Sequence, residues 1–302
     1  MNFISNIIDN QFNILKKNNK LKKNLLISSV GNNSVHRKCN WEYSEKNYNT
    51  LFIYYEKFIP QESDYYLKMK GKKLSQYFYI FQTKLINHYK YIFILDNDNI
   101  ISGKEISELF NVANNLNANI LSPSVRIKNI HYKKVHKFLN FFYNDYQKIE
   151  SKKKYRNYWT MRNELPDDLI KTYDQCRKYS AWIHMIQRFN KKDKIIKKVN
   201  IVEDGRSIIK TNLILKFRKD KKFMKLFDSG IIFDHVLANL CNFSRIYVVD
   251  YITYIHRDPY NDKENEKIEG KKIINYIKKN NTIKNFKMVW LDVVKEHCFT
   301  YK

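Results

Sequence analysis

The sequence predicts an α/β protein built on a mixed, mostly parallel sheet flanked by helices. The first observation is an apolar run over residues 91–95, rich in β-branched and aromatic residues, which is typical of a central strand buried on both faces. The second is the alternation of such runs with segments of helical length. The third is size, because 302 residues with 43% hydrophobic content can bury one large core. We expect a single domain over residues 24–302.

The predicted elements alternate along the N-terminal part of the chain. Strands are expected over residues 24–30, 50–55, 91–95 and 118–121, and helices over residues 73–87 and 104–116. This order indicates parallel strands joined by right-handed crossovers. Downstream the pattern becomes mixed, with strands expected over 198–202 and 245–255 and helices over 208–218, 232–240 and 271–278.

Residues 1–23 predict a separate N-terminal element. Apolar residues recur there at helical spacing, at Phe3, Ile4, Ile7, Ile8, Phe12 and Leu15. Polar residues interrupt them, so the segment lacks the apolar core of a signal peptide, and no segment of the chain is long enough to span a membrane. We expect a basic amphipathic helix that packs on the domain or makes a peripheral contact with a membrane or a partner.

The cysteine pattern bears on the compartment. Cys39, Cys176, Cys241 and Cys298 are far apart and show no zinc-type pairing, which argues against a disulfide framework or a zinc module. The expected location is therefore the cytoplasm or another reducing compartment.

The charge balance suggests an anionic partner, but composition offers a competing explanation. The chain has 56 basic and 30 acidic residues. Between residues 191 and 225 there are thirteen basic residues but only four acidic ones. Such a patch could attract a nucleotide diphosphate, an acidic acceptor or a nucleic acid. The abundance of Lys, Asn, Ile, Tyr and Phe is also what a genome biased toward A and T codons produces. Familiar nucleic-acid motifs are absent from the sequence, so nucleic acid is not the expected main ligand.

Two aspartates follow the apolar run, at Asp96 and Asp98. An uncompensated carboxylate inside the sheet costs several kcal/mol, so both should lie at its rim, where ligands of open α/β sheets bind. There they could hold a hard divalent cation and leave positions for water and substrate phosphates. Asp, Asn and Asp are also ordinary turn residues, and one of them could simply cap the next helix.

Further motifs, together with this turn, resemble an uncharacterised GT-A-like glycosyltransferase family. They are, in order, SSVGNNSVHRKCNW from Ser28, LFIYY from Leu51, KGKK from Lys70, YIFILDND from Tyr91, SGIIFD from Ser229 and VVDYITYIHRDP from Val248. The resemblance covers roughly residues 24 to 260 and implies a GT-A-like, Rossmann-like fold. It also implies that the Asp-x-Asp element, Asp96 and Asp98, holds Mn²⁺ or Mg²⁺ on the diphosphate of a nucleotide sugar.

The resemblance assigns further ligands. The loop after the first strand, with Gly31 and Asn33, would bind the nucleotide. Lys72 and Lys73 could supplement the metal by neutralising phosphate charge, although either could be a solvated surface lysine. His256 ends an apolar strand and, like a late histidine in related folds, would be a third metal ligand; its alternative role is that of a hydrogen-bonded residue at the sheet rim.

Asp234 is the candidate catalytic base. It should occupy the first turn of a short helix, where the helix dipole alone favours an acidic residue. The resemblance instead implies that it deprotonates the acceptor hydroxyl for direct, inverting displacement at the anomeric carbon. Ile231 and Ile232 stand where family members commonly carry tryptophan and glycine, and residues 202–207 (VEDGRS) depart from a more apolar pattern.

The resulting hypothesis is a metal-dependent glycosyltransferase. It would move a sugar from a nucleotide-sugar donor to a hydroxyl of a glycan, lipid or protein. Two alternatives stay open: a basic protein that has kept the fold but lost activity and binds nucleic acid or an acidic glycan, and a nucleotidyltransferase that uses the same paired aspartates.

Overall fold

A computed structural model of the chain gives the positions of most residues. The described residues are 13–14, 21–56, 62–71, 73–127, 131–140, 167–179, 183–227, 232–256, 264–288 and 296–302. Lys72 and residues 228–231 lie outside them.

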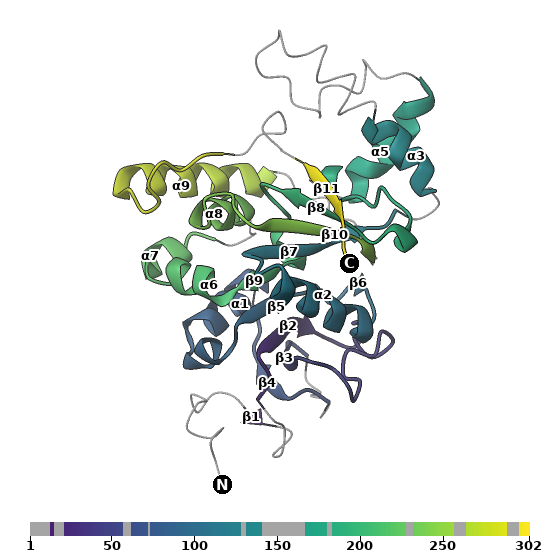
Figure 1. Cartoon of the computed structure of the whole chain (residues 1–302). Helices are drawn as coiled ribbons and strands as arrows, with labels where there is room; N and C mark the ends of the chain where they lie inside the picture. Colours follow the sequence, from purple (N-terminus) through teal and green to yellow (C-terminus); the bar gives the residue numbers. More distant parts are fainter. Residues whose placement is uncertain are drawn as a thin grey trace.

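One sheet runs through the whole molecule, from β1 and β4 at one end to β8 and β11 at the other (Figure 1). Its strands are β1 (Asn13–Ile14), β2 (Asn24–Val30), β3 (Asn49–Tyr54), β4 (Tyr65–Lys68), β5 (Tyr91–Ile94), β7 (Ile120–Val125), β8 (Ile195–Val199), β9 (Ile208–Lys210), β10 (Ile246–His256) and β11 (His297–Thr300). Their spatial order is β1-β4-β3-β2-β5-β9-β7-β10-β8-β11, and the short β6 (Asn99–Ile100) pairs with β10 off this path.

The sheet is mixed, as predicted, but its neighbouring strands are not mostly parallel. Four of the nine neighbouring pairs along this order are parallel and five are antiparallel. The difference arises because β9 runs in the opposite direction between β5 and β7, and β8 does so between β10 and β11. Strands β2, β3, β4, β5, β7 and β10 still point the same way, so their carboxyl ends share one edge of the sheet.

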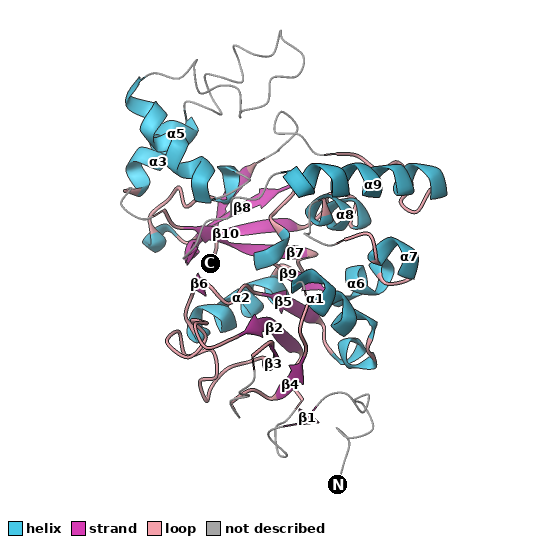
Figure 2. Ribbon diagram, turned by 180° about the vertical axis from the view of Figure 1, so that it is seen from behind, coloured by secondary structure: helices cyan, strands magenta, loops and turns pink. Residues whose placement is uncertain are grey.

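Helices cover both faces of the sheet. The α-helices are α1 (Lys73–Gln82), α2 (Gly103–Asn115), α3 (Tyr132–Asn140), α5 (Asp167–Tyr179), α6 (Thr211–Phe217), α7 (Lys221–Met224), α8 (Phe233–Leu240) and α9 (Glu264–Asn280). Both views place α6, α7 and α8 on one side of the sheet and α2 on the other (Figures 1 and 2). The pair α3 and α5 packs together near the β8 and β11 end.

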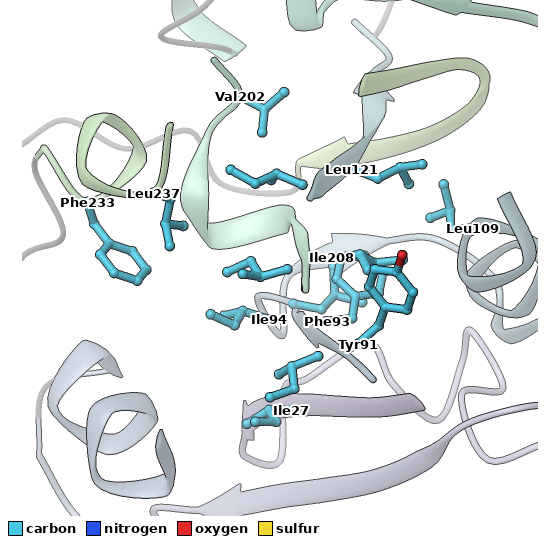
Figure 3. Packing of buried hydrophobic residues seen from close by; sticks show 14 of the residues in the cluster. Ile27, Tyr91, Phe93, Ile94, Leu109, Leu121, Val202, Ile208, Phe233 and Leu237 are labelled. Atoms are coloured by element: carbon cyan, nitrogen blue, oxygen red, sulfur yellow. The ribbon is translucent and has the colours of Figure 1, made fainter. Parts of the chain in front are cut away.

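The core is continuous through the sheet. Phe93 of β5 and Leu109 of α2 are fully buried on one side, and Phe233 and Leu237 of α8 are buried on the other (Figure 3). Every residue of β2, β3 and β5 is buried, which is the burial that their apolar sequences predict.

Several predicted elements match closely. The strand expected over 24–30 is β2, and those expected over 50–55 and 91–95 are β3 and β5, each displaced by at most one residue at either end. The helix over 104–116 is α2, which begins with a capping box in which Ser102 and Glu105 exchange hydrogen bonds.

Other elements differ from the prediction. The strand expected over 198–202 is β8, which begins and ends three residues earlier than predicted; Ile196 and Lys197, which point to opposite faces of the sheet, are both buried. The helix expected from residue 208 begins at Thr211, since the β-branched Ile208 and Ile209 form β9 instead. Within the predicted N-terminal helix, Asn13 and Ile14 form a strand paired with β4; the other residues up to 20 lie outside the described part.

Two expectations about the whole chain can be compared with the structure. Among the described residues, no helix combines the length and the hydrophobicity that crossing a membrane requires. All four cysteines are free thiols, in line with the prediction that the fold has no disulfide framework.

Candidate functional site

The turn after β5 lies at the carboxyl edge of the sheet, as predicted. Leu95 still donates a hydrogen bond to the carbonyl of Ile27 at 3.1 Å, and then the chain turns, with the Asn99 amide bonded to the carbonyl of Asp96 at 3.1 Å. The side chains of Asp96 and Asp98 are 15% and 26% exposed. Both carboxylates therefore lie at the rim, where a ligand from solvent can reach them.

Strand β6 brings His256 to this turn. Asn99 lies opposite His256 in the antiparallel pairing of β6 with β10, and the His256 Nε2 atom lies 3.0 Å from Asp98 Oδ2. Both His256 and Asn99 are buried. Asp98 and His256, both predicted as metal ligands, are thus in direct contact, and the two-residue strand that brings them together was not predicted from the sequence.

The charge of Asp98 is stabilised in place. Burial by itself raises the pKa of Asp98, but the hydrogen bond and charge of His256, together with the charges of Lys73 and Arg206, outweigh it and lower the pKa. The Oδ1 atom of Asp98 is buried and has no hydrogen-bond partner among the described residues. A carboxylate oxygen without a hydrogen-bond partner can coordinate a cation.

The Asp98–His256 geometry fits a divalent cation. Adjacent ligands of an octahedral site with bonds of about 2.1 Å lie about 3.0 Å apart, which is the separation observed between Asp98 Oδ2 and His256 Nε2. The same separation suits a hydrogen bond, so a metal would have to replace the shared proton.

Asp96 faces different partners. Its Oδ1 forms an ion pair with Lys73, the first residue of α1. Its Oδ2 faces Gly205, where a Cβ atom would lie 3.3 Å away. Across the described residues, no three His, Cys, Asp or Glu side chains are already grouped to hold a metal. Asp98 and His256 are in contact, and Asp96 is held by Lys73 beside them.

The loop after β2 is hydrogen-bonded to the same turn. The Asn97 side chain donates hydrogen bonds to Ser34 at 2.9 Å and Tyr55 at 3.2 Å, and the Val35 amide donates to the carbonyl of Asn97 at 2.9 Å. A Cβ atom at Gly31 would meet the Tyr55 hydroxyl at 2.5 Å, so glycine fits the close approach there. Asn33 is exposed on this loop.

Asp234 occupies the first turn of α8, as predicted. Its Oδ1 accepts a hydrogen bond from the His235 amide at 2.7 Å, and the His235 ring lies 4.0 Å away. The residue before the helix, Ile232, adopts φ 71°, a left-handed conformation that is costly for a β-branched side chain. Backbone strain therefore lies two residues from the candidate base.

Sequence reasoning missed two members of the site, Glu203 and Arg206. They precede β9, which starts at the carboxyl edge because it runs opposite to β5. Arg206 is buried; its Nη1 atom lies 2.8 Å from Glu203 Oε2 and donates to the Tyr254 hydroxyl at 2.8 Å. The available signal was Gly205, which stands beside these residues in a chain with only six glycines.

The electrostatics of Glu203 link the candidate residues. Burial raises the pKa of Glu203; the charges of Arg206 and His256 oppose this shift, whereas those of Asp234 and Asp96 add to it. The predicted base Asp234 and two of the predicted metal ligands, Asp96 and His256, therefore lie within electrostatic range of one carboxylate. A perturbed carboxyl group among several charged neighbours is typical of a functional site.

Not every basic residue in the stretch over residues 191–225 lies on the surface. Lys197 is fully buried and forms an ion pair with Asp250 at 2.7 Å. Arg206 is buried at the candidate site. Two of the thirteen basic residues thus have structural or local roles, which weakens this stretch as an interface for a large anion.

Comparison with known proteins adds no assignment. No protein-family model matches this sequence, and a search of curated proteins found no match. Function must therefore be inferred from the arrangement of side chains at the carboxyl edge of the sheet.

Proposed function

We propose that this protein is a divalent-metal-dependent glycosyltransferase with a GT-A-like fold. The observation that carries the proposal is the contact of Asp98 with His256 at the carboxyl edge of the sheet, beside Asp96 and within electrostatic range of Glu203, as Asp234 also is. A metal-dependent, inverting glycosyltransferase needs a cation site and a base near one another, and in this proposal separate elements would supply them.

Asp98, His256 and Asp96 would hold Mn²⁺ or Mg²⁺. The unpartnered Oδ1 of Asp98 and the separation of Asp98 from His256 are the features that fit such an ion. When bound, the ion would neutralise the charge that grows on the diphosphate as the sugar–phosphate bond breaks. The loop with Gly31 and Asn33 would contact the nucleotide.

Asp234 would take the proton from the acceptor hydroxyl. The hydroxyl oxygen then forms a bond to the anomeric carbon while the bond from that carbon to the diphosphate oxygen breaks, which inverts the configuration. The acceptor would be a hydroxyl of a glycan, lipid or protein. The hydrogen bond from the His235 amide orients the Asp234 carboxylate.

The test is a thermal-shift screen. Nucleoside diphosphates such as UDP and GDP are added with and without Mn²⁺. Ligand at about 100 times its dissociation constant adds roughly 2.7 kcal/mol, which raises the melting temperature by several degrees. A metal-dependent shift with one nucleotide supports the proposal, and no shift with any nucleotide overturns it.

A second assay separates sugar transfer from nucleotidyl transfer. The binding nucleotide is supplied as its sugar conjugate, labelled in the sugar. Release of nucleoside diphosphate with label on the acceptor supports a glycosyltransferase, whereas release of pyrophosphate from a nucleoside triphosphate would favour the nucleotidyltransferase.

A further inference from the structure

The ion pair between Lys73 and Asp96 places a protein cation on one of the proposed metal ligands. We propose that Lys73 holds Asp96 until a nucleoside diphosphate draws the ammonium group away, so that this lysine couples metal binding to diphosphate binding. The inference rests on the proposed function, and it adds a positioning role for one residue.

The backbone of Lys73 is fixed at the carboxyl edge. Gln76, which is buried in the first turn of α1, accepts a hydrogen bond from Ser29 of β2 at 2.7 Å. Its amide group donates to the carbonyls of Met69 and Gly71 at 3.0 and 3.3 Å. The first turn of α1, which carries Lys73, is therefore tied to the end of β2 through Gln76.

The side chain itself has freedom to move. The Lys73 side chain is 40% exposed. Ion pairs of this exposure contribute little to stability, so breaking this one costs little. A lysine on a flexible stem can therefore exchange one anionic partner for another without a change in the fold.

Asp96 cannot serve the lysine and a metal fully at once. The ammonium group occupies Oδ1, so only Oδ2 remains for a cation, and it has room because Gly205 lacks the Cβ atom that would lie 3.3 Å from this oxygen. A divalent cation bound nearby would also repel the ammonium group. Metal binding thus favours the state in which Lys73 has left Asp96, and a diphosphate offers the ammonium group its new partner.

The consequence is a reciprocal linkage. Mn²⁺ should bind weakly to the free protein and more tightly once the diphosphate has bound. By the same linkage, Mn²⁺ should increase the affinity of the protein for the diphosphate by the same factor. In any site that binds both ligands, direct attraction between the metal and the diphosphate contributes to this coupling. The contribution that arises because Lys73 exchanges Asp96 for the diphosphate should disappear when the charge of Lys73 is removed.

The experiment measures Mn²⁺ affinity by calorimetry with and without UDP or GDP, whichever binds. The variants are Lys73→Met, Lys73→Arg and, as a matched control, Lys84→Met, which removes an exposed lysine that follows the other end of α1. In Lys73→Met, Mn²⁺ alone should bind about two- to fivefold more tightly, and the coupling should fall by the same factor. The nucleotide alone should bind roughly tenfold more weakly. Lys73→Arg and Lys84→Met should stay close to the wild type.

The outcomes distinguish the inference from the proposed function. Unchanged affinity for Mn²⁺ alone in Lys73→Met, with wild-type binding intact, overturns the competition at Asp96. Unchanged affinity for the nucleotide alone overturns the exchange of partners. If the wild type binds neither Mn²⁺ nor a nucleotide, the proposed function itself fails.

Discussion

Lys197 of β8 and Asp250 of β10 form an ion pair in which neither side chain is exposed. The lysine also donates to the carbonyl of Ile186 at 3.0 Å, and Asp250 accepts from the amides of Arg188 and Phe189 and from the Ser124 hydroxyl. These bonds offset the cost of burying two charges and join β8, β10 and the segment around residue 188.

Removing one charge of this pair should destabilise the fold. Lys197→Met leaves a buried carboxylate without its counter-charge, so we expect a loss of about 3 to 5 kcal/mol in the free energy of unfolding, measured with urea. Lys198→Met, which removes the exposed neighbour, is the control and should change it little. The double variant Lys197→Met with Asp250→Asn should lose less than the two single variants summed. Additive losses would mean that the pair is not coupled.

Asp98→Asn tests the proposed metal site. The change removes the negative charge in contact with His256, so Mn²⁺-dependent nucleotide affinity and sugar transfer should fall together by roughly tenfold or more. Titration calorimetry and a transfer assay measure the two effects. Asp168→Asn, which alters an exposed ion pair with Lys137, serves as the control. Wild-type metal affinity in Asp98→Asn would remove this residue from the ligand set.

Asp234→Asn tests the proposed catalytic base. Because its proposed partner is the acceptor, transfer should fall by roughly 10²-fold or more while nucleotide and metal affinities stay nearly intact. If Asp234 only stabilises the first turn of α8, Asp234→Asn should leave sugar transfer almost unchanged, because asparagine caps a helix about as well as aspartate. Glu203→Gln, made in parallel, checks the neighbouring carboxyl group. A loss of transfer in Glu203→Gln but not in Asp234→Asn would move the base assignment to Glu203.

The stability of the fold should depend on the protonation of His184. This side chain is fully buried, with Nε2 2.7 Å from the carbonyl of Ile201, and burial lowers its pKa to about 4. The unfolded chain, with a pKa near 6.5, binds the proton first as pH falls. Its contribution is therefore fully present above about pH 6.5 and is lost as pH falls toward 4.

Urea unfolding at pH 7 and pH 5 measures this effect. The linkage predicts a loss of about 2 kcal/mol between the two values from His184 alone. His184→Gln should flatten this part of the pH dependence, whatever its effect at pH 7. His88→Gln, at an exposed position, should not. Equal pH dependence in wild type and His184→Gln would show that the proton does not distinguish the folded state from the unfolded state.

Strands can be predicted from the sequence where burial on both faces requires the residues to be apolar. Residues 91–95 have to be apolar because β5 is buried on both faces, and Asp96 has to end the strand for the same reason. The rim position of Asp96 and Asp98 therefore follows from composition alone.

The remaining features depend on contacts between distant segments. The pairing of Asn99 with His256 involves a strand of two residues, which is too short to leave a periodic pattern. From the sequence alone Lys197 is predicted to lie on a basic surface, because its partner Asp250 is 53 positions away along the chain (250 − 197). Glu203 and Arg206 reach the site because β9 is antiparallel, and a run of three residues does not reveal its direction.

The pairing of β6 with β10 also bears on the order of folding. Asn99 and His256 are separated by 157 positions, the difference between 256 and 99, and the pairing closes only after β10 is complete. Contacts between such distant residues form slowly, because the entropy of the intervening chain must be lost before they contribute. During synthesis, β2 to β5 can assemble from local crossovers while the Asp98 carboxylate still lacks its histidine. A nascent chain that ends just before β10 would hold most of the strands but would lack His256 at the proposed cation site, so binding of the cation would report on completion of the fold.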